Sequence, residues 1–234
     1  MPERRGEGKL AYMFNILLTK KLSQEHLDLI KSWEWNYEIV ETLKISPVDV
    51  KEIPLDADAW IVSSRNSFAA IKKFINEPPN VIYCVGDWTK KEIEKLNTKC
   101  KVKSFENMRS LVADLASQNF RSVIYFCGDE HRQELEAGLK NTNTKISKVI
   151  THQSEMTFPV LKKSFDAVFV FSPRSAESLL KNNQFSSQTV FACIGPTTVD
   201  YLHSRGIGNT FVSSYPDSKI LIQEFHLTNS RLAT

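Results

Sequence analysis

Short turns rich in glycine and hydroxyl side chains follow the apolar runs of this sequence. Each turn precedes a stretch with helical spacing, so its backbone N–H groups should lie at the start of a helix. Helix starts carry unpaired N–H donors and the positive end of the helix dipole, which favour carboxylates and phosphates. The turns read Ser63-Ser64-Arg65-Asn66, Gly86-Asp87-Trp88-Thr89, Cys127-Gly128-Asp129, Ser172-Pro173-Arg174-Ser175 and Gly195-Pro196-Thr197-Thr198. This pattern predicts a site for an anionic ligand.

Metal, nucleotide and redox chemistry are less well supported. Glu130 and His131 form a charged turn, but no second pair of metal ligands lies at a suitable spacing. The glycines of residues 6–11 match a dinucleotide fingerprint in letters only, because they precede the first apolar run instead of following one. No two of the four cysteines form a C-x-x-C pair, and three lie in apolar runs: Cys84, Cys127 and Cys193. They indicate small buried side chains in a reducing compartment.

The apolar runs repeat along the chain at a nearly constant offset. Three pairs of segments share it: Asp58 to Ser67 with Asp166 to Ser175, Val81 to Thr89 with Val190 to Thr198, and Ile16 to Leu18 with Val123 to Tyr125. Three pairs at one offset indicate a duplicated structural unit.

Each repeat alternates apolar runs, polar turns and amphipathic stretches. Apolar runs without alternation are typical of strands buried on both faces of a parallel sheet. We expect strands at 15–18, 37–42, 59–63, 81–85, 102–104, 122–127, 146–151, 167–171, 190–194 and 210–213. We expect helices at 90–96, 132–139, 175–181 and 198–205, with Gly206 ending the last one. Alternation of strand and helix predicts an α/β protein with two flavodoxin-like parallel sheets of five strands each.

Two segments that contain proline flank the central block. They are Leu43-Lys44-Ile45-Ser46-Pro47 and Met156-Thr157-Phe158-Pro159. Proline restricts the residue before it to extended conformations, so we expect these segments to cross between domains. The sequence alone leaves open how the strands divide between the two domains.

Composition and charge are those of an ordinary globular protein. The 234 residues are 41% hydrophobic and 24% charged, which suits two domains. A net charge of +3 does not indicate nucleic-acid binding, although it allows a local basic cleft. No apolar run approaches the roughly 18 residues of a membrane span, and the charged start is a poor signal peptide. We therefore expect a cytoplasmic monomer, with no membrane or nucleic-acid partner and a flexible tail at 1–9.

The ordered series of turns resembles the uroporphyrinogen-III synthase family. The matching features are Ser64-x-Asn66, Gly86-x-x-Thr89, Cys127-Gly128 with Arg132, Phe171-Ser172-Pro173-x-Ser175 and Ile194-Gly195-Pro196-Thr197-Thr198. Each turn alone is weak, but their order and spacing hold from about Asn15 to Phe225.

The resemblance implies a fold and an activity. One domain would be discontinuous, taking residues 10–42 and 162–234, and the other would be the inserted block 46–157. Two extended linkers would join them, with the substrate in the cleft between. The implied enzyme is a lyase of haem biosynthesis that closes hydroxymethylbilane, a linear tetrapyrrole, with inversion of the last pyrrole ring. The family uses no metal and no organic cofactor.

Such a substrate carries acetate and propionate groups on every ring and requires distributed anion contacts. Backbone N–H groups would come from the helix starts after Ser64, Gly86, Ser172 and Gly195, and Gly128 is a further substrate-binding candidate. Hydroxyl donors would come from Ser63, Ser64, Thr89, Ser172, Thr197 and Thr198. Arg65, Arg174, Lys20 and Arg132 would add charge at the rim. Helix N-capping explains serine and threonine at these places equally well, so both interpretations stay open.

Two residues are candidates for the chemistry itself. The family often has a tyrosine that is thought to assist departure of the substrate hydroxyl, and His152 occupies that position here. An imidazole there could donate a hydrogen bond or act as a general acid near pH 7. Thr89 is the second candidate. Other departures are Lys20-Lys21, where the family tends to have Arg-Pro, and Glu41-Thr42, where a proline is common.

Two rival functions are compatible with parts of this pattern. A non-catalytic two-domain protein could bind a small anion or a tetrapyrrole with the same turns. A pair of signalling receiver domains would need an acidic pocket with an opposing lysine. Asp87 and Asp129 are single acids without such a cluster, which disfavours receivers.

Overall fold

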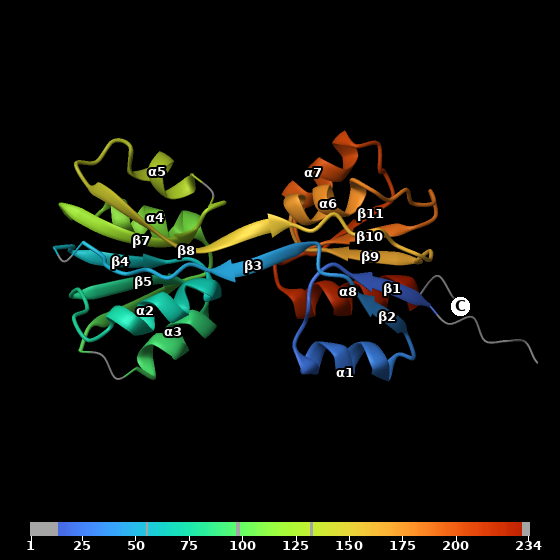
Figure 1. The fold of residues 1–234 in the computed structure, drawn as a ribbon, viewed down its shortest axis with the longest axis horizontal. Helices are drawn as coiled ribbons and strands as arrows, with labels where there is room; N and C mark the ends of the chain where they lie inside the picture. The colour runs from blue at the N-terminus through green and yellow to red at the C-terminus, as the bar shows by residue number, and fades with distance from the viewer. Residues whose placement is uncertain (1–13, 55, 97–98, 132, 231–234) are drawn as a thin grey trace, which may run out of the picture. The chain divides into compact units, whose positions relative to one another are not determined.

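The computed structural model describes residues 14–54, 56–96, 99–131 and 133–230, and the tail expected at 1–9 lies outside these ranges. The chain forms two compact units (Figure 1). Unit 1 contains the described residues up to Lys44 and those from Met156 onward, and unit 2 contains Ile45–Glu155. Within the described ranges, no helix has the length and apolar character needed to cross a membrane.

Unit 1 is a parallel sheet with helices on both faces. The strand order is β11-β10-β9-β1-β2, and each strand runs parallel to its neighbours. The strands are β1 (Asn15–Leu18), β2 (Asn36–Ile39), β9 (Ala167–Val170), β10 (Val190–Cys193) and β11 (Thr210–Val212). The helices are α1 (Gln24–Ser32), α6 (Pro173–Leu180), α7 (Pro196–Ser204) and α8 (Ser218–Ser230).

Successive residues of the interior strand β1 enter two different cores. Ile16 and Leu18 pack with the side chains of α1 and α8, including Phe225. Leu17 packs with those of α6 and α7, including Leu179. All five side chains are fully buried, and Figure 1 shows these helix pairs on opposite faces of the sheet. Burial on both faces explains why the strands read as continuous apolar runs.

Unit 2 repeats this plan with one additional strand. The order is β3-β8-β7-β4-β5-β6, with parallel pairing from β8 through to β6. The strands are β3 (Leu43–Pro47), β4 (Ala59–Val62), β5 (Val81–Val85), β6 (Lys101–Phe105), β7 (Ser122–Gly128) and β8 (Lys145–Met156). The helices are α2 (Phe68–Phe74), α3 (Asp87–Glu94), α4 (Met108–Ala116) and α5 (Glu134–Leu139), and a short 3₁₀ helix, η1 (Arg65–Ser67), precedes α2. In Figure 1, α2 and α3 cover one face and α4 and α5 the other.

The same aspartate contact begins the central strands of both units. Asp58 accepts hydrogen bonds from the backbone N–H groups of Arg121 (2.6 Å) and Ser122 (3.1 Å) at the start of β7. Asp166 accepts one from the N–H of Asn15 (2.7 Å) at the start of β1. In addition, each aspartate donates its own N–H to the facing carbonyl, Ser122 or Asn15, at 2.9 Å. These contacts place the duplicated segments at equivalent points of two similar sheets.

The predicted class, α/β with two parallel sheets, is confirmed, and the predicted count of five strands is wrong for one sheet. Each predicted strand overlaps an observed strand, and Gly206 follows α7 with φ +79°. Leu43–Pro47, expected to cross between domains, does contain the division between the units, but it also forms the edge strand β3, so this sheet has six strands instead of five. Its proline stands at the last position of an edge strand, where a missing N–H costs little. Strand β8 also continues beyond residue 151 to Met156.

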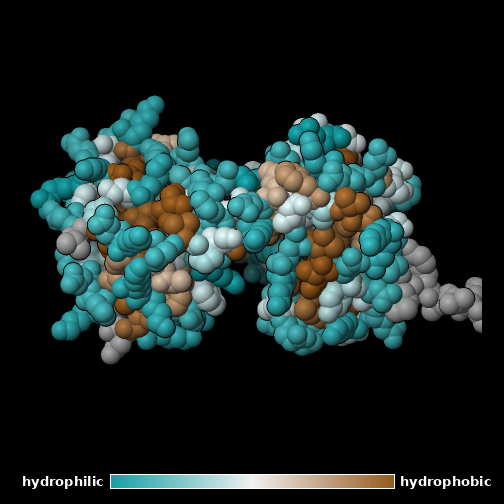
Figure 2. All heavy atoms as spheres, viewed as in Figure 1, coloured by the Kyte–Doolittle hydropathy of each residue, from teal (hydrophilic) through white to brown (hydrophobic). Residues whose placement is uncertain are grey.

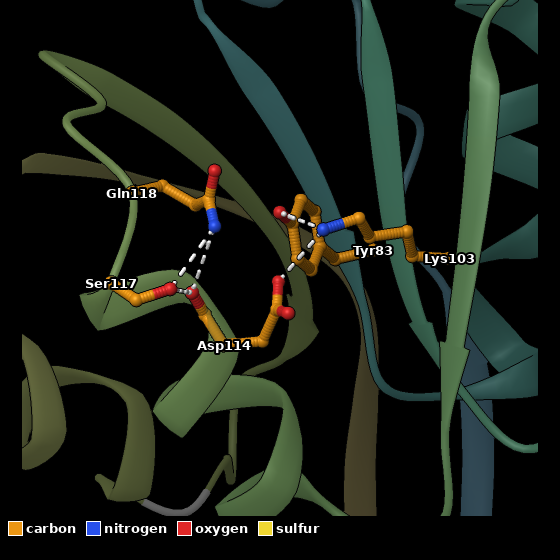
Figure 3. Close-up of polar contacts among 5 residues, drawn as sticks. All are labelled: Tyr83, Lys103, Asp114, Ser117 and Gln118. Carbon is orange, nitrogen blue, oxygen red and sulfur yellow. Dashed lines mark hydrogen bonds and ion pairs between the residues drawn. The ribbon is translucent and has the colours of Figure 1, made fainter.

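A half-buried polar network attaches α4 to the edge of the second sheet (Figure 3). The ammonium group of Lys103 on β6 donates to Asp114 Oδ2 on α4 at 3.0 Å and to the hydroxyl of Tyr83 on β5 at 3.2 Å. The hydrogen bond from Lys103 lowers the pKa of Asp114. Burial raises the pKa of Tyr83, which keeps its hydroxyl protonated at neutral pH.

We predict that Lys103→Met lowers the free energy of unfolding by about 1 kcal/mol at pH 7, because the pair is partly exposed and screened. Asp114 has a pKa below its ordinary value of 3.8, so its contribution is fully present above pH 3.8 and is lost as the pH falls through the lower, folded-state pKa. Urea denaturation at several pH values should therefore show the difference shrinking in acid. An equal loss in the exposed-loop control Lys99→Met, or a difference independent of pH, would contradict this role.

Candidate functional site

The predicted site residues lie in turns at the carboxyl ends of the parallel strands. In unit 2, Ser63 to Arg65 follow β4, Gly86 to Thr89 follow β5, and Gly128 ends β7. In unit 1, Ser172 to Arg174 follow β9 and Gly195 to Thr198 follow β10. Strands that run in parallel end at the same edge of a sheet, so each unit gathers its own candidates at one edge. Arg132 lies outside the described residues.

Serines cap the helices that follow β4 and β9. Ser64 Oγ accepts a hydrogen bond from the N–H of Asn66 at 3.2 Å, and Ser172 Oγ accepts one from the N–H of Ser175 at 3.1 Å. The structural interpretation of these two hydroxyls is therefore correct, although each keeps a proton that it can donate. Ser63 Oγ lies 2.9 Å from the hydroxyl of Tyr125, so it already has a partner inside unit 2.

The helices that follow β5 and β10 begin differently. Their N-cap residues are Gly86 and Gly195, and neither helix start has a side-chain cap. The first-turn N–H groups of α3 and α7 are therefore not occupied by a capping side chain, unlike those after β4 and β9. This alternation of a capped and an uncapped helix start occurs in both units.

Thr89 and Thr198 occupy the same position, three residues after the N-cap glycine. Both are buried, with exposed fractions of 3% and 1%. Thr198 Oγ1 has no hydrogen-bond partner within the described residues. Neither threonine is an N-cap, so capping does not account for these two hydroxyls, in contrast to Ser64 and Ser172. A buried hydroxyl without a partner is costly and calls for an explanation.

The two N-cap glycines have different reasons to be glycine. Gly86 has φ +83°, a conformation that other residues adopt only with strain. Gly195 has φ −176°, which any residue adopts, and a Cβ built on it would meet no atom within 4 Å. Neither backbone conformation nor packing in unit 1 requires glycine at position 195. A ligand that approaches the backbone closely at this position would require glycine there.

His152 is held inside unit 2. It is 8% exposed, and its Nδ1 lies 2.9 Å from Thr151 Oγ1. Thr151 Oγ1 also lies 3.0 Å from the carbonyl of Cys127, and a hydroxyl that donates there accepts a proton from Nδ1. On the other side of the ring, Nε2 lies so close to Gly128 that a Cβ there would be 2.6 Å away.

Burial lowers the pKa of His152, and the charge of Asp129 offsets this only in part. The imidazole is therefore mostly neutral at pH 7, and its Nε2 faces Gly128. A neutral imidazole is a weaker acid than an imidazolium, so this geometry suits a positioning role better than proton donation. The catalytic assignment of His152 stays a prediction.

Two buried hydroxyl clusters were not recognised in the sequence. In unit 2, Ser67 Oγ lies 2.9 Å from Thr151 Oγ1. In unit 1, Ser175 Oγ lies 2.6 Å from Thr42 Oγ1 and donates to Thr19 Oγ1 at 2.9 Å. Ser67 and Ser175 are the last residues of the first repeat pair, so the repeat alignment already showed a serine at the same place in both units. The clusters join the helix after β4 or β9 to neighbouring strand ends and thus hold the turns in place.

The cysteines and His131 at the strand ends of unit 2 do not form a nucleophilic or metal-binding site. Burial raises the pKa of Cys84 and Cys127 to about 11, so both are protonated thiols at neutral pH and poor nucleophiles. His131 uses both ring nitrogens, toward the carbonyl of Gly128 (3.1 Å) and Glu136 Oε1 (3.0 Å). Among the described residues, no three His, Cys, Asp or Glu side chains gather as a metal site requires.

Comparison with known proteins identifies the family. The family model described as uroporphyrinogen-III synthase HemD matches residues 37–223, most of the chain. The chain belongs to the uroporphyrinogen-III synthase family. It is thus a lyase of haem biosynthesis that acts on a tetrapyrrole substrate, as the ordered turns predicted. A search of the curated proteins finds no match.

Solved structures of synthases share the fold of this chain. The uroporphyrinogen-III synthetase from Helicobacter pylori is 16% identical, with a TM-score of 0.67 over 93% of this chain and 100% of that one. A mutant uroporphyrinogen III synthase from Thermus thermophilus is 10% identical, with a TM-score of 0.60 over 93% and 99%. At these identities the likeness concerns the fold, and the assignment of site residues depends on the geometry described above.

We predict that Gly128→Ala lowers the free energy of unfolding by about 1–3 kcal/mol, because the new methyl group overlaps His152 Nε2. Adding His152→Ala should remove most of this penalty, which urea denaturation of the single and double variants would measure as a coupling energy. Gly208→Ala is the control, since its Cβ meets nothing within 4 Å. Additive effects of the two substitutions would show that the glycine and the imidazole are not in contact.

Proposed function

We propose that the uncapped starts of α3 and α7 bind carboxylates of hydroxymethylbilane while this chain closes it to uroporphyrinogen III. The observation that supports this assignment is the pattern of glycine N-caps at Gly86 and Gly195 without side-chain caps. Each start leaves N–H donors directed along the positive end of a helix dipole, where a carboxylate is stabilised. The capped turns at Ser64 and Ser172 would contribute their remaining hydroxyl protons.

The buried threonines are proposed to contact the substrate at the same helix starts. Thr198 Oγ1 lacks a partner within the described residues, and a substrate oxygen would provide one. Thr89 is its counterpart in unit 2 and is our candidate for contact with the reacting end of the substrate. Arg65 and Arg174, in the neighbouring turns, would add charge for the remaining acid groups.

Positioning is proposed as the main source of catalysis. The family reaction expels the terminal hydroxyl as water, and the reactive product of that step closes spontaneously to the uninverted ring. The protein then has to hold the chain so that the inverted closure is faster, for which well-oriented groups supply large effective molarities. Loss of one contact should therefore change the isomer ratio and turnover without abolishing reaction of the substrate.

We further propose that the enzyme acts in the cytoplasm as a monomer and without a nucleic-acid partner. Buried, protonated thiols such as Cys84 and Cys193 suit a reducing compartment. A net charge of +3 over 234 residues gives no general attraction to nucleic acid. Sedimentation of the purified chain at several concentrations would test the oligomeric state, and a concentration-dependent dimer would contradict it.

The activity is tested by supplying hydroxymethylbilane and resolving the product isomers against a protein-free blank. The wild-type chain should give the type III isomer in excess. If only the spontaneous type I isomer forms, in the amount seen in the blank, the chain is a binding protein and the catalytic proposal is wrong.

The threonine assignment is tested in the same assay. Thr89→Val and Thr198→Val, which remove a hydroxyl with little change of shape, should lower turnover more than Cys84→Ala at matched stability. Cys84 is a fitting control because it lies within β5, before the turn, and its side chain is fully buried. A larger effect of Cys84→Ala would contradict the proposed contacts.

We predict that Gly195→Ala leaves the free energy of unfolding unchanged or slightly higher, because the added methyl group meets no atom and the unfolded chain loses freedom. Turnover should nevertheless fall roughly 10- to 100-fold, because the methyl group would hold a bound carboxylate away from the helix start. Gly208→Ala, equally free of contacts, should keep full turnover. Full activity of Gly195→Ala would show that no ligand approaches this backbone.

A further inference from the structure

One exposed aromatic side chain lies next to the proposed anion contacts of unit 2. Figure 2 shows a largely hydrophilic surface interrupted by apolar patches. The large apolar side chains exposed in the described part of the chain are Ile45, Trp88, Phe158, Val160, Val212, Tyr215 and Leu227. Trp88 stands out among them because it lies in the first turn of α3, directly before Thr89, and is 39% exposed.

Neighbouring side chains hold the indole ring in place. The ring of Phe68, at the start of α2, meets Trp88 edge to face with centroids 6.0 Å apart. The guanidinium carbon of Arg65, in η1, lies 5.1 Å from the centroid of the Trp88 ring. Phe68 itself packs against the buried core of unit 2, so the Trp88 ring contacts a side chain that the core holds in place.

Arg65 makes no ion pair with a carboxylate of the described residues. Its contact with Trp88 is a cation–π interaction, which leaves the N–H donors of the guanidinium for another acceptor. An exposed arginine next to an exposed aromatic ring offers two complementary contacts: a flat apolar surface and a fork of donors for a carboxylate.

The duplicated fold does not require this pair. In the repeat alignment, Trp88 corresponds to Thr197 and Arg65 to Pro173, and unit 1 forms the same strand-turn-helix connections with those residues. Trp88 also leaves 39% of its surface open to contact with a ligand. The pair therefore calls for a ligand-based explanation.

We propose that Trp88 and Arg65 bind one pyrrole ring of the substrate together with a carboxylate on that ring. The pyrrole would stack against the indole, and the guanidinium would pair with the acetate or propionate group. This inference rests on the proposed function. It makes unit 2 specific for a flat acidic heterocycle, whereas unit 1 has Thr197 and Pro173 at the equivalent positions. Stacking of a pyrrole ring on the indole should change the affinity for the substrate by roughly three- to tenfold.

The test is steady-state kinetics on the full-length chain with hydroxymethylbilane as the probe. Trp88→Ala should raise KM roughly three- to tenfold, and Trp88→Phe, which keeps an aromatic ring beside Phe68, should raise it less. Arg65→Met should raise KM to a similar extent, and the double variant Trp88→Ala with Arg65→Met should show less than the product of the two effects, because both residues hold the same ring. Trp33→Phe, in the aromatic cluster of unit 1, is the control and should leave KM unchanged.

The outcomes separate this inference from the proposed function. If the wild-type chain makes the type III isomer but Trp88→Ala and Arg65→Met keep its KM within a factor of two, the inference is wrong and the enzyme assignment stands. If the wild-type chain gives only the spontaneous isomer, the proposed function is wrong and the inference, which rests on it, is overturned as well. Should Trp88→Ala not fold, as judged by circular dichroism, Trp88→Phe and Arg65→Met decide the question, and unchanged KM in both would overturn the proposal.

Discussion

The proposed binding of the substrate depends on two helix starts at which a glycine stands in place of a capping side chain. At the starts of α3 and α7, glycine takes the N-cap position, and the first-turn N–H groups have no side-chain acceptor. Backbone donors at a helix start are obligatory hydrogen-bonding groups, so they are satisfied by water or by a ligand. Such starts suit carboxylates, and we propose that the tetrapyrrole substrate of this enzyme family supplies them.

Around these starts, each unit keeps its turns in place by the same two devices. An aspartate before the central strand pair, Asp58 or Asp166, fixes the relative position of two neighbouring strands. At the other end of the strands, a serine of the following helix, Ser67 or Ser175, joins a buried hydroxyl cluster. The serine-capped turns after β4 and β9, which lie beside the starts of α3 and α7 at the same sheet edges, are thus fixed from both ends of the sheet.

Much of the fold could be predicted because its signals are local. Buried parallel strands read as apolar runs, the duplication repeats them, and glycine with hydroxyl residues marks the turns. Strand β3 was missed because an edge strand of two-sided exposure, with a terminal proline, lacks that apolar pattern. The surroundings of His152 could not be predicted either, since its packing against Gly128 depends on a tertiary contact between β7 and β8 that no spacing in the sequence encodes.

The most direct test of the uncapped helix starts is a titration followed by NMR of the backbone amides. With ¹⁵N-labelled protein and uroporphyrin, the stable oxidised form of the product, the amide signals of Trp88, Thr89 and Thr197 should shift with a common affinity. Those of the serine-capped donors Asn66 and Ser175 should shift less, because an oxygen of the chain already accepts their protons. Saturable binding that leaves the first-turn amides of α3 and α7 unchanged would contradict the account.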